Sequence, residues 1–455
     1  MLNLQSKNLA LFFSSLTVVG VILIWVPYFL GTSVAFNQWN QIILLLLGGA
    51  VMALFFLDRL YLVFVTFACV IGEAMGSTIL PFSLIRWVFM SQLALFGVLD
   101  SILSRVPFKL RVVDFWAFCF MSLCFYSQSY SFKPDLTFQR SCSLVIFFLA
   151  VFRGIWNYFE DEKKIISLGT ALVRGSFYIS VIGFLFWRGG RFSGIFCNPN
   201  AVGLLVTLVF PLALQNYFST RSKISGFVLF VFITNLILCQ ARAGLLATLL
   251  SASFFLWFYD RTNKYVIATV FLLGGVSIFL IIELFNGGIL SSFLRFETLD
   301  TGGGRLQAWR ELIRLIGYRP WLGYGFGTED HIFEKFNIIF DQHAGLYAHN
   351  SYLGLVTQVG FVGAALFFLP MIFFIVLRGF SIMRNRHQDT FGLELALLAS
   401  IIGGMIHAVF ESWMYSAGNP LNLIFWILLA CLYRFAMNRK QFNSAISTGK
   451  MGEHS

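Results

Sequence analysis

The chain has 455 residues, of which 58% are hydrophobic and 12% are charged, and its formal net charge is +11. Soluble globular proteins carry about 25% charged residues, so this composition excludes an ordinary soluble domain. The positive charge does not indicate nucleic-acid binding, because the Lys and Arg residues are spread over short segments between apolar runs. The seven cysteines lie mostly within apolar runs and lack metal-type spacing, so we expect small core residues.

Apolar runs of membrane-spanning length follow one another along the whole sequence. About 20 apolar residues form a helix that crosses the hydrocarbon core of a bilayer and satisfies its own backbone groups there. We therefore predict an all-α integral membrane protein, a polytopic helical bundle of about 12–14 transmembrane helices with one long, partly helical outer loop. The predicted spans lie near residues 10–32, 41–57, 60–80, 84–99, 112–127, 141–157, 165–187, 200–217, 224–241, 243–259, 265–285, 350–377, 392–412 and 420–437.

This pattern predicts a single transmembrane domain over residues 1–437, followed by a polar tail at 438–455. Residues 10–31 lack the preceding basic region and the small-residue cleavage site of a signal peptide, so we expect them to be retained as a first span. The one long connection between predicted spans is residues 286–349. Long connections of this kind are usually functional.

Lys and Arg residues are enriched at one predicted membrane face. If the N-terminus is cytoplasmic, eighteen of them lie in cytoplasmic segments and five lie in short loops on the opposite face. Cytoplasmic loops of membrane proteins carry this excess, so both termini are predicted to be cytoplasmic and the long loop to lie outside. The five basic residues in the short outer loops are Lys133, Arg140, Arg188, Arg191 and Arg242.

Candidate functional residues lie on the outer face, where the charge rule disfavours arginine. The long loop re-enters the membrane at His349-Asn350-Ser351, and Glu411 lies near the outer end of the next-to-last span. The arginine motifs are Arg188-Gly-Gly-Arg191 followed by Phe192-Ser-Gly194, Ala241-Arg242-Ala-Gly244, and Gly304-Arg305 with Trp309.

Each candidate also has a structural explanation. An arginine at a membrane edge commonly reaches lipid phosphate. Arg305 fits the solvated face of an amphipathic helix, and His349 fits a capping or packing residue at a helix start. The pair Asn350-Ser351 is a common helix-start sequence. We expect Glu411 to pair with one of the arginines and not to act as an acid.

Together, several arginines and one histidine on the same membrane face suit a dianionic or pyrophosphate ligand. Guanidinium groups offer fixed charge and paired donors to phosphate oxygens. The helix start after His349 adds free backbone amides and a positive dipole end. A neutral histidine can take a proton from a hydroxyl nucleophile. These groups suit displacement of a diphosphate from an anomeric carbon. The outer face lacks an Asp-x-Asp pair, so the sequence does not suggest a metal site there.

The long loop is expected to contain a helix and a turn. Residues near 305–317 have helical spacing that predicts one amphipathic helix, with Trp309, Leu312 and Ile316 packed inward. The Pro- and Gly-rich segment 320–327 predicts a turn. The aromatic candidates for stacking on a sugar, with simple packing as the alternative, are Trp309, Trp321 and Tyr324.

In type and order, these motifs resemble those of the O-antigen ligase and polymerase superfamily of bacterial envelope glycosyltransferases. The ligase-like core covers residues 160–437, and its motifs run from 188 to 435. Each motif is only a few residues long, so the specificity lies in the ordered set on a matching topology. The matching elements are Arg191-Phe-Ser-Gly194, Asn198-Pro-Asn200, Ala241-Arg242-Ala-Gly244, Gly304-Arg305 with Trp309, Pro320-Trp-Leu-Gly-Tyr-Gly325, and His349-Asn-Ser351 followed by Gly360-Phe-Val-Gly363.

The resemblance implies a glycan donor linked to undecaprenyl diphosphate and an inverting transfer without metal or cofactor. It implies a bacterial inner-membrane protein with its active site on the periplasmic face. The implied acceptor is lipid A core or a second glycan-lipid, with membrane lipid around the protein.

The resemblance also implies roles for single residues. Arg191, Arg242 and Arg305 would contact the diphosphate. Arg191 is preferred over Arg188 because its Arg-x-x-Gly spacing to Gly194 matches the family.

His349 would activate the acceptor hydroxyl. It is preferred over His331 and His343, which lie in the same loop, because it directly precedes a membrane helix. The candidate supporting residues are Glu411, Asn350 and Trp309.

Several reactions in this family use the same groups. Ligation of O-antigen to lipid A core, a step of lipopolysaccharide biosynthesis, is the first interpretation. A polysaccharide polymerase and a protein O-oligosaccharyltransferase are the alternatives within the family. A transporter or flippase of lipid-linked sugar is the rival from another class, and it would need charges at the bilayer midplane. Its intramembrane candidates are Glu73, Arg86, Arg174, Glu283 and Glu394, whereas His407 is expected to form a hydrogen bond between helices.

Overall fold

The structure is a computed structural model of the whole chain. The residues it describes are 82–103, 111–159, 162–187, 189–196, 198–260, 269, 305–338, 347–417 and 419–447. Their secondary structure is helical, with no strand among them, which confirms the prediction of an all-α membrane protein. The predicted spans at 10–32, 41–57, 60–80 and nearly all of 265–285 lie outside the described residues. So do residues 286–304 at the start of the predicted loop and residues 448–455 at the end of the predicted tail.

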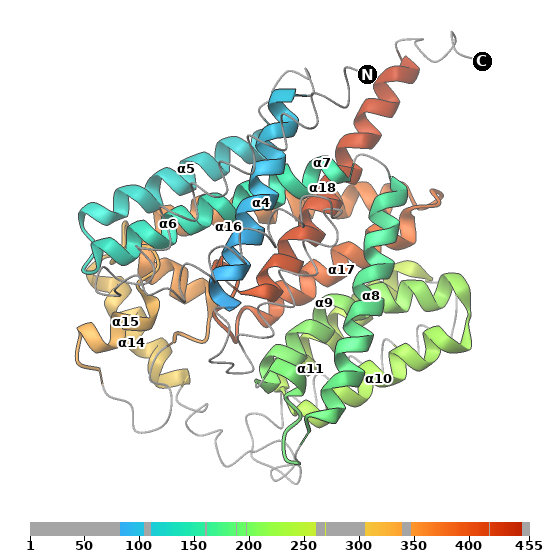
Figure 1. Cartoon of the computed structure of the whole chain (residues 1–455), viewed down its shortest axis with the longest axis horizontal. Coiled ribbons are helices and arrows are strands. Elements are labelled where there is room, and N and C mark those ends of the chain that lie inside the picture. Colours follow the sequence, from blue (N-terminus) through green and yellow to red (C-terminus); the bar gives the residue numbers. More distant parts are fainter. Residues whose placement is uncertain are drawn as a thin grey trace, which may run out of the picture. The chain divides into compact units, whose positions relative to one another are not determined.

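The described helices match the predicted spans to within a few residues at most ends (Figure 1). In chain order they are α4 (Phe82–Leu103), α5 (Val112–Tyr126), α6 (Pro134–Leu149), α7 (Trp156–Tyr158), α8 (Glu162–Leu185), α9 (Pro199–Thr220), α10 (Lys223–Cys239), α11 (Arg242–Tyr259), α14 (Arg305–Tyr318), α15 (Glu329–Lys335), α16 (Ser351–Arg384), α17 (Phe391–His407) and α18 (Pro420–Ser447). A 3-10 turn, η1 (Ser127–Ser129), follows α5, a π-helical segment, η2 (Ala150–Ile155), joins α6 to α7, and a second 3-10 turn, η3 (Gly194–Phe196), precedes α9.

Five helical segments of the described chain are long and apolar enough to cross a membrane. They are α8, α9, α11, α16 and the continuous segment Pro134–Tyr158 formed by α6, η2 and α7. Three shorter apolar helices accompany them, namely α10, α17 and residues Leu421–Met437 of α18. The predicted count of 12–14 spans includes segments outside the described residues and stays a prediction.

One predicted span ends earlier than expected. The span predicted at 392–412 corresponds to α17, which ends at His407, so Glu411 lies in the turn beyond the helix. Just beyond this helix end, the carbonyl of Ala408 accepts the backbone N–H of Ser351 at 2.8 Å, which joins the turn to the start of α16.

The chain divides into two compact units, residues 1–109 with 145–160, and residues 110–144 with 161–455. In the first unit, α4 packs against η2 and α7. Gly97 and Gly154 make this contact close, since a β-carbon on either glycine would overlap with backbone of the facing segment. Small residues of this kind let membrane helices approach closely.

The second unit is built around α9. This helix packs against α8, α10, α11, α17 and α18, and its residues from Val202 to Leu214 are all buried. Figure 1 shows α8, α9, α10 and α11 as one group of neighbouring helices. Because α9 is apolar around its whole circumference, burial inside a bundle is the arrangement that its sequence favours.

Small residues set the crossings of α9 with α11 and α17. A β-carbon on Gly244 would lie 2.6 Å from the Cα of Gly203, so these two glycines allow α9 and α11 to touch. The hydroxyls of Thr207 and Thr248 are 2.9 Å apart across the same interface. As a result, the start of α9, the start of α11 and the end of α17 lie at the same end of this helix group.

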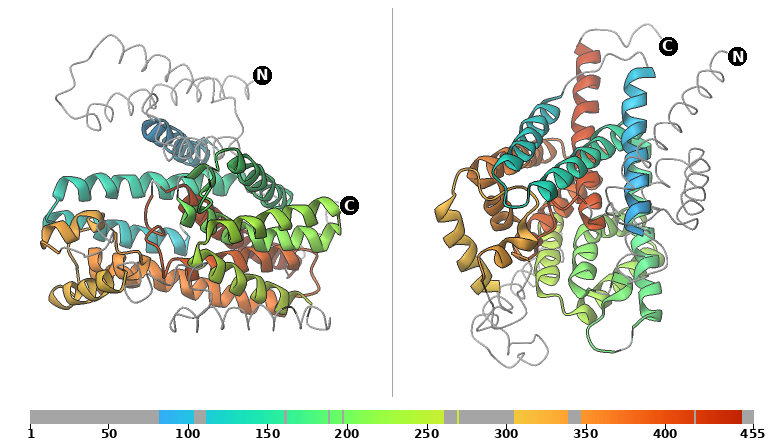
Figure 2. Two further views of the ribbon diagram at one scale, coloured as in Figure 1. Left: turned by 90° about the horizontal axis from the view of Figure 1, so that it is seen from below. Right: turned by 60° about the vertical axis from the view of Figure 1, so that its left-hand side comes forward.

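The described part of the long loop forms a cap with its own small core. α14 begins at Arg305 and is amphipathic, as predicted, with Leu312 and Ile316 buried and Trp309 partly buried. Figure 2 shows α14 and α15 as short helices beside the long helix α16. The buried residues of the cap core are Ala308, Leu312, Leu315, Tyr324, Ile332, Phe333 and Ala348.

The turn predicted at 320–327 fits into a break in α16. Gly360 has φ +66° and interrupts the helix, which frees backbone groups on both sides of the break. The turn occupies them: Phe361 N–H donates to the Pro320 carbonyl at 2.7 Å, and Gly325 N–H donates to the Gln358 carbonyl at 2.8 Å. A broken membrane helix is tolerated where other protein groups satisfy its backbone. This pairing fixes the cap to α16.

Candidate active site

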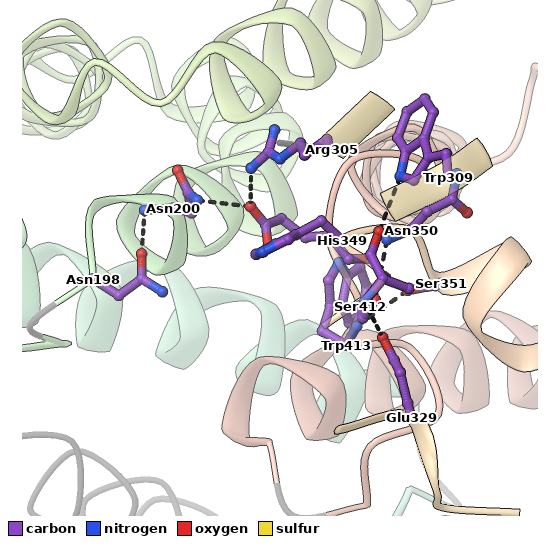
Figure 3. A network of polar contacts seen from close by, with 12 residues as sticks. Asn198, Asn200, Arg305, Trp309, Glu329, His349, Asn350, Ser351, Ser412 and Trp413 are labelled. Carbon is purple, nitrogen blue, oxygen red and sulfur yellow. Dashed lines mark hydrogen bonds and ion pairs between the residues drawn. The ribbon is translucent and has the colours of Figure 1, made fainter. Parts of the chain in front are cut away.

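The carboxylate of Glu411 connects three side chains from distant parts of the sequence. Its Oε1 accepts a hydrogen bond from Asn200 Nδ2 at 2.7 Å and forms an ion pair with Arg305 Nη2 at 2.5 Å. Its Oε2 lies 3.1 Å from Nδ1 of His349. Figure 3 shows Asn200, Arg305 and His349 gathered around this carboxylate. The expected pairing of Glu411 with an arginine is confirmed, and the arginine is Arg305.

Each of these side chains lies at the end of a helix. Asn200 is in the first turn of α9, where Pro199 is the first helical residue and the Asn198 side chain caps the helix by accepting the N–H of Asn200 at 2.9 Å. Proline at the first helical position and asparagine at the cap are common helix-start residues. Arg305 is the first residue of α14, and His349 lies two residues before α16. The positions of these helix starts therefore place the three side chains next to Glu411.

The ionic state of Glu411 follows from these partners. Burial raises the pKa of this carboxyl, but the hydrogen bond from His349 and the charge of Arg305 outweigh burial, so the net shift is below its usual value. Glu411 is therefore ionised near neutral pH. An ionised carboxylate only accepts hydrogen bonds. Nδ1 of His349 consequently carries a proton in this contact, and in the tautomer with one ring proton Nε2 is an acceptor.

The backbone around His349 is unusual. His349 has φ +47°, in the left-handed region that residues with a β-carbon rarely adopt. The peptide before it is fixed, because Trp309 Nε1 donates to the carbonyl of Ala348 at 2.9 Å. The ring of the exposed Tyr347 stands edge-on to the imidazole with 6.5 Å between ring centroids. Trp309 thus supports the histidine through its backbone.

The helix start after His349 differs from the sequence-based expectation of free amides. The Asn350 side chain caps α16 by accepting the N–H groups of Tyr352 and Leu353, both at 2.9 Å. Asn350 N–H donates to the Ser412 hydroxyl at 3.0 Å, and Ser351 N–H donates to the carbonyl of the turn after α17. The expectation was wrong because this turn packs onto the helix start. Asn350 is therefore a capping residue here.

Arg191 binds backbone carbonyls. Its Nε donates to the Cys239 carbonyl at 3.2 Å, and its Nη2 lies 3.4 Å from the Gln240 carbonyl and 3.5 Å from Asn200 Oδ1. These carbonyls belong to the end of α10 and the turn that leads to Arg242, the partly exposed first residue of α11. Arg191 thus supports the segment that carries Arg242, and Asn200 links it to Glu411. Arg188 lies outside the described residues.

The other candidate histidines and aromatic residues of the loop differ in burial and in contacts. His331 contacts the exposed Glu334 on its own helix at 3.3 Å, and His343 lies outside the described residues. Tyr324 is buried and donates its hydroxyl to the Leu315 carbonyl at 2.9 Å, so it is a packing residue and not a stacking platform. Trp321 is exposed beside the break in α16.

His407 does not make the hydrogen bond between helices that we expected. The residue is fully buried, and within the described part of the chain neither ring nitrogen has a hydrogen-bond partner. Its ring packs near Trp413, with 6.4 Å between ring centroids. The expected hydrogen bond is therefore absent from the described part of the chain.

The intramembrane charges named for a transporter contact neighbouring side chains, are exposed, or lie outside the described residues. Glu394 forms a buried ion pair with Arg378 and accepts the hydroxyl of Thr390 at 2.9 Å. The guanidinium of Arg86 lies 5.6 Å from the ring of Trp87, and Arg174 is exposed. Glu73 and Glu283 lie outside the described residues.

Residues that the sequence reasoning did not assign also belong to the site. Asn200 was part of a quoted motif without a role, and its place in the first turn after Pro199 was the available signal. Glu329 and Tyr415 had no local signal, because their contact joins segments that are distant in sequence. Among the described residues, no three His, Cys, Asp or Glu side chains gather as metal ligands would.

A family of known proteins matches the segment of the chain that contains three of the candidate site residues. The family described as O-Antigen ligase matches residues 227–368. This match agrees with the resemblance to the O-antigen ligase superfamily that the sequence motifs indicate. The matched segment contains Arg242, Arg305 and His349, whereas Arg191 precedes it and Glu411 follows it.

The chain is also similar to a curated protein, the ComP-specific O-oligosaccharyltransferase of Acinetobacter baylyi (strain ATCC 33305 / BD413 / ADP1). The two sequences are 24% identical over 303 residues, which cover 62% of this chain and 54% of the relative. The chain thus spans about half the length of this relative.

Proposed function

We propose that this protein is a membrane glycosyltransferase of the O-antigen ligase superfamily. It moves a glycan from undecaprenyl diphosphate to an acceptor hydroxyl at the periplasmic face of the inner membrane. The observation that carries the proposal is the convergence of Arg305 and His349 on the carboxylate of Glu411. A base oriented by a carboxylate beside a fixed positive charge suits the displacement of an anionic leaving group.

His349 is the general base. Glu411 holds Nδ1–H, so Nε2 takes the proton from the acceptor hydroxyl as its oxygen attacks the anomeric carbon. A bond forms between the acceptor oxygen and the anomeric carbon, and the bond between that carbon and the diphosphate oxygen breaks. A single displacement of this kind inverts the anomeric configuration. Glu411 stabilises the imidazolium that forms.

Arg305 stabilises the departing diphosphate. One of its Nη atoms pairs with Glu411, and within the described part of the chain its other N–H groups have no protein partner. A guanidinium group carries five N–H donors, so it can bind a carboxylate and phosphate oxygens at once. Arg242 supplies a second charge from the start of α11, and Arg191 supports that turn. These charges take the place of a metal ion.

The first acceptor that we propose is lipid A core, which corresponds to the family description of an O-Antigen ligase. A protein hydroxyl is the second candidate, because the name of the curated relative describes O-linked transfer of an oligosaccharide. Extension of a second glycan-lipid by polymerisation is the third. All three acceptors present a hydroxyl to the same base.

The test is transfer by the purified full chain in lipid nanodiscs. The donor is undecaprenyl-diphosphate glycan, and lipid A core, a second glycan-lipid and a Ser-rich protein are offered in separate reactions, each with and without EDTA. Transfer should survive EDTA and be lost in Arg305→Ala and His349→Ala. Arg314→Ala is the matched control, because Arg314 lies on the same helix and pairs with Glu311 at 2.8 Å.

The product identifies the acceptor. Glycosylated lipid A core indicates a ligase, a longer glycan-lipid indicates a polymerase, and modified protein indicates an oligosaccharyltransferase. No transfer to any acceptor, together with movement of the glycan-lipid across the bilayer, would contradict the enzyme proposal and leave the transporter.

A further inference from the structure

Glu329 is a buried carboxylate at the start of α15, in the cap. Its Oε1 accepts the backbone N–H of Ala348 at 2.9 Å, and its Oε2 accepts the hydroxyl of Tyr415. Ala348 directly precedes His349, and Tyr415 lies in the turn that carries Glu411. One carboxylate from the cap therefore joins the two segments that bring the histidine and its carboxylate partner together.

The peptide group of Ala348 is held on both sides. Trp309 donates to its carbonyl, and Glu329 accepts from its N–H, each at 2.9 Å. His349 follows with its left-handed φ of +47°. A residue with a β-carbon persists in such a conformation only where the surrounding structure holds it. The two hydrogen bonds at Ala348 provide that restraint.

Glu329 is in turn fixed from outside the site. The neighbouring Asp330 accepts both guanidinium Nη atoms of Arg140, on α6, at 3.0 and 2.6 Å. Arg140 also donates to the carbonyl of Gly327 at 2.6 Å, so the start of α15 is held at two points. Gly354 leaves room for the contact, since a β-carbon there would overlap with the hydroxyl of Tyr415.

We propose that Glu329 is a positioning residue for glycan transfer. It holds the backbone before His349 so that the imidazole stays on Glu411 with Nε2 directed to the acceptor. The inference rests on the proposed function, because His349 is the base only in that reaction. Glu329 acts through the backbone of Ala348 and the hydroxyl of Tyr415, without contact to the reacting atoms.

The variants of Glu329 should separate a hydrogen-bonding role from a charge. Glu329→Ala should lower kcat about 100-fold, the cost of a misplacement of about 1 Å. The KM for the donor should change little, because arginines on other elements bind the diphosphate. Glu329→Gln keeps an oxygen that accepts from Ala348 and should retain most of the wild-type kcat. Glu329→Asp is one methylene shorter, cannot reach both partners and should lose about tenfold.

The experiment pairs kinetics with a readout that does not need activity. Diethyl pyrocarbonate modifies accessible imidazoles, and mass spectrometry of the His349 peptide gives the modification rate in each variant of the full chain. The rate should rise in Glu329→Ala and Glu329→Asp, because a released imidazole samples solvent, and should stay near wild type in Glu329→Gln. Glu334→Gln is the control, since Glu334 is exposed on the same helix.

Distinct outcomes overturn the two proposals. Unchanged modification rates and kcat in the Ala and Asp variants would overturn the positioning role, as would an equal loss in Glu329→Gln and Glu329→Ala. If the Ala variant does not fold, the Asp and Gln variants carry the same comparison. If the wild-type chain transfers no glycan to any acceptor, the proposed function fails, and if His349→Ala transfers at the wild-type rate, His349 is not the base. In both cases the modification rates still report whether Glu329 holds His349.

Discussion

Nδ1 of His349 lies 3.1 Å from Oε2 of Glu411, although the two residues are separated by 62 positions in the sequence. The other oxygen of the same carboxylate binds Arg305 and Asn200. His349, the proposed base, and Arg305, proposed to bind the diphosphate, therefore share one negatively charged partner. A change at Glu411 should affect proton transfer and leaving-group stabilisation together.

Glu411→Gln should lower kcat by about 1,000-fold, because the amide no longer fixes the Nδ1–H tautomer of His349 or neutralises the imidazolium. The measurement is glycan transfer over a pH series with saturating donor. Glu311→Gln is the control, since Glu311 pairs with Arg314 on the cap surface. Wild-type kcat in the Glu411→Gln variant would remove Glu411 from the mechanism.

Arg305→Lys should bind the donor more weakly and react more slowly than wild type. A lysine keeps the charge but lacks the paired donors that hold a carboxylate and phosphate oxygens at once. We expect a loss of about 100-fold in kcat/KM for the donor and a larger loss in Arg305→Ala. Single-turnover transfer checks this, with Arg314→Lys on the same helix as the control. Equal losses in both lysine variants would contradict a specific role.

Arg191 and Arg242 should not act independently. Arg191 binds the carbonyls of Cys239 and Gln240, directly before the segment that starts at Arg242. Arg191→Ala should therefore displace Arg242, and the losses in donor binding from the two Ala substitutions should not add. A double-mutant cycle on the KM for the donor measures this coupling. Additive free-energy changes would show that Arg191 contacts the donor without acting on Arg242.

The carboxyl groups of Glu411 and Glu329 should give opposite pH dependence of stability. The pKa of Glu411 is lowered by its partners, so its stabilisation is present near neutral pH and is lost as the pH falls through the folded-state pKa. Burial raises the pKa of Glu329, so its contribution is greatest at acid pH and is lost as the pH rises. Glu411→Gln should lower Tm more at pH 7 than at pH 4, and Glu329→Gln should raise Tm at pH 7. Thermal unfolding followed by Trp fluorescence in detergent tests both signs.

Gly360→Ala should loosen the cap from α16. The residue has φ +66°, and a β-carbon would overlap with the backbone of Trp321 and Leu322. The conformational cost alone is about 1 kcal/mol. We expect a lower Tm and increased protease cleavage in 305–338, measured beside Gly379→Ala, where the added carbon has ordinary contact with Leu398. Equal stability of both variants would show that the turn does not depend on this break.

The sequence predicted several residues of the candidate site, but it did not predict most of the contacts between them. Arg305, His349 and Glu411 were selected from charge, position and motif order, and the structure brings these three together. Asn200 and Glu329 were not assigned, because no local pattern marks a residue whose partners lie elsewhere in the chain. The amides at the start of α16 were predicted to be free because a helix start read alone has no partners.

The sequence by itself determined the membrane class, the described spans and the amphipathic helix at Arg305. Those properties depend on composition and on periodicity within about 20 residues, which any stretch of chain carries locally. Only the tertiary structure decided which arginine meets Glu411, which groups cap the helix after His349, and how Glu329 holds Ala348. Those contacts depend on the crossing of α9, α11 and α17 and on the docking of the cap. These bring Asn200, Arg305 and His349 within hydrogen-bond distance of Glu411, from which each is more than 60 positions away in the sequence.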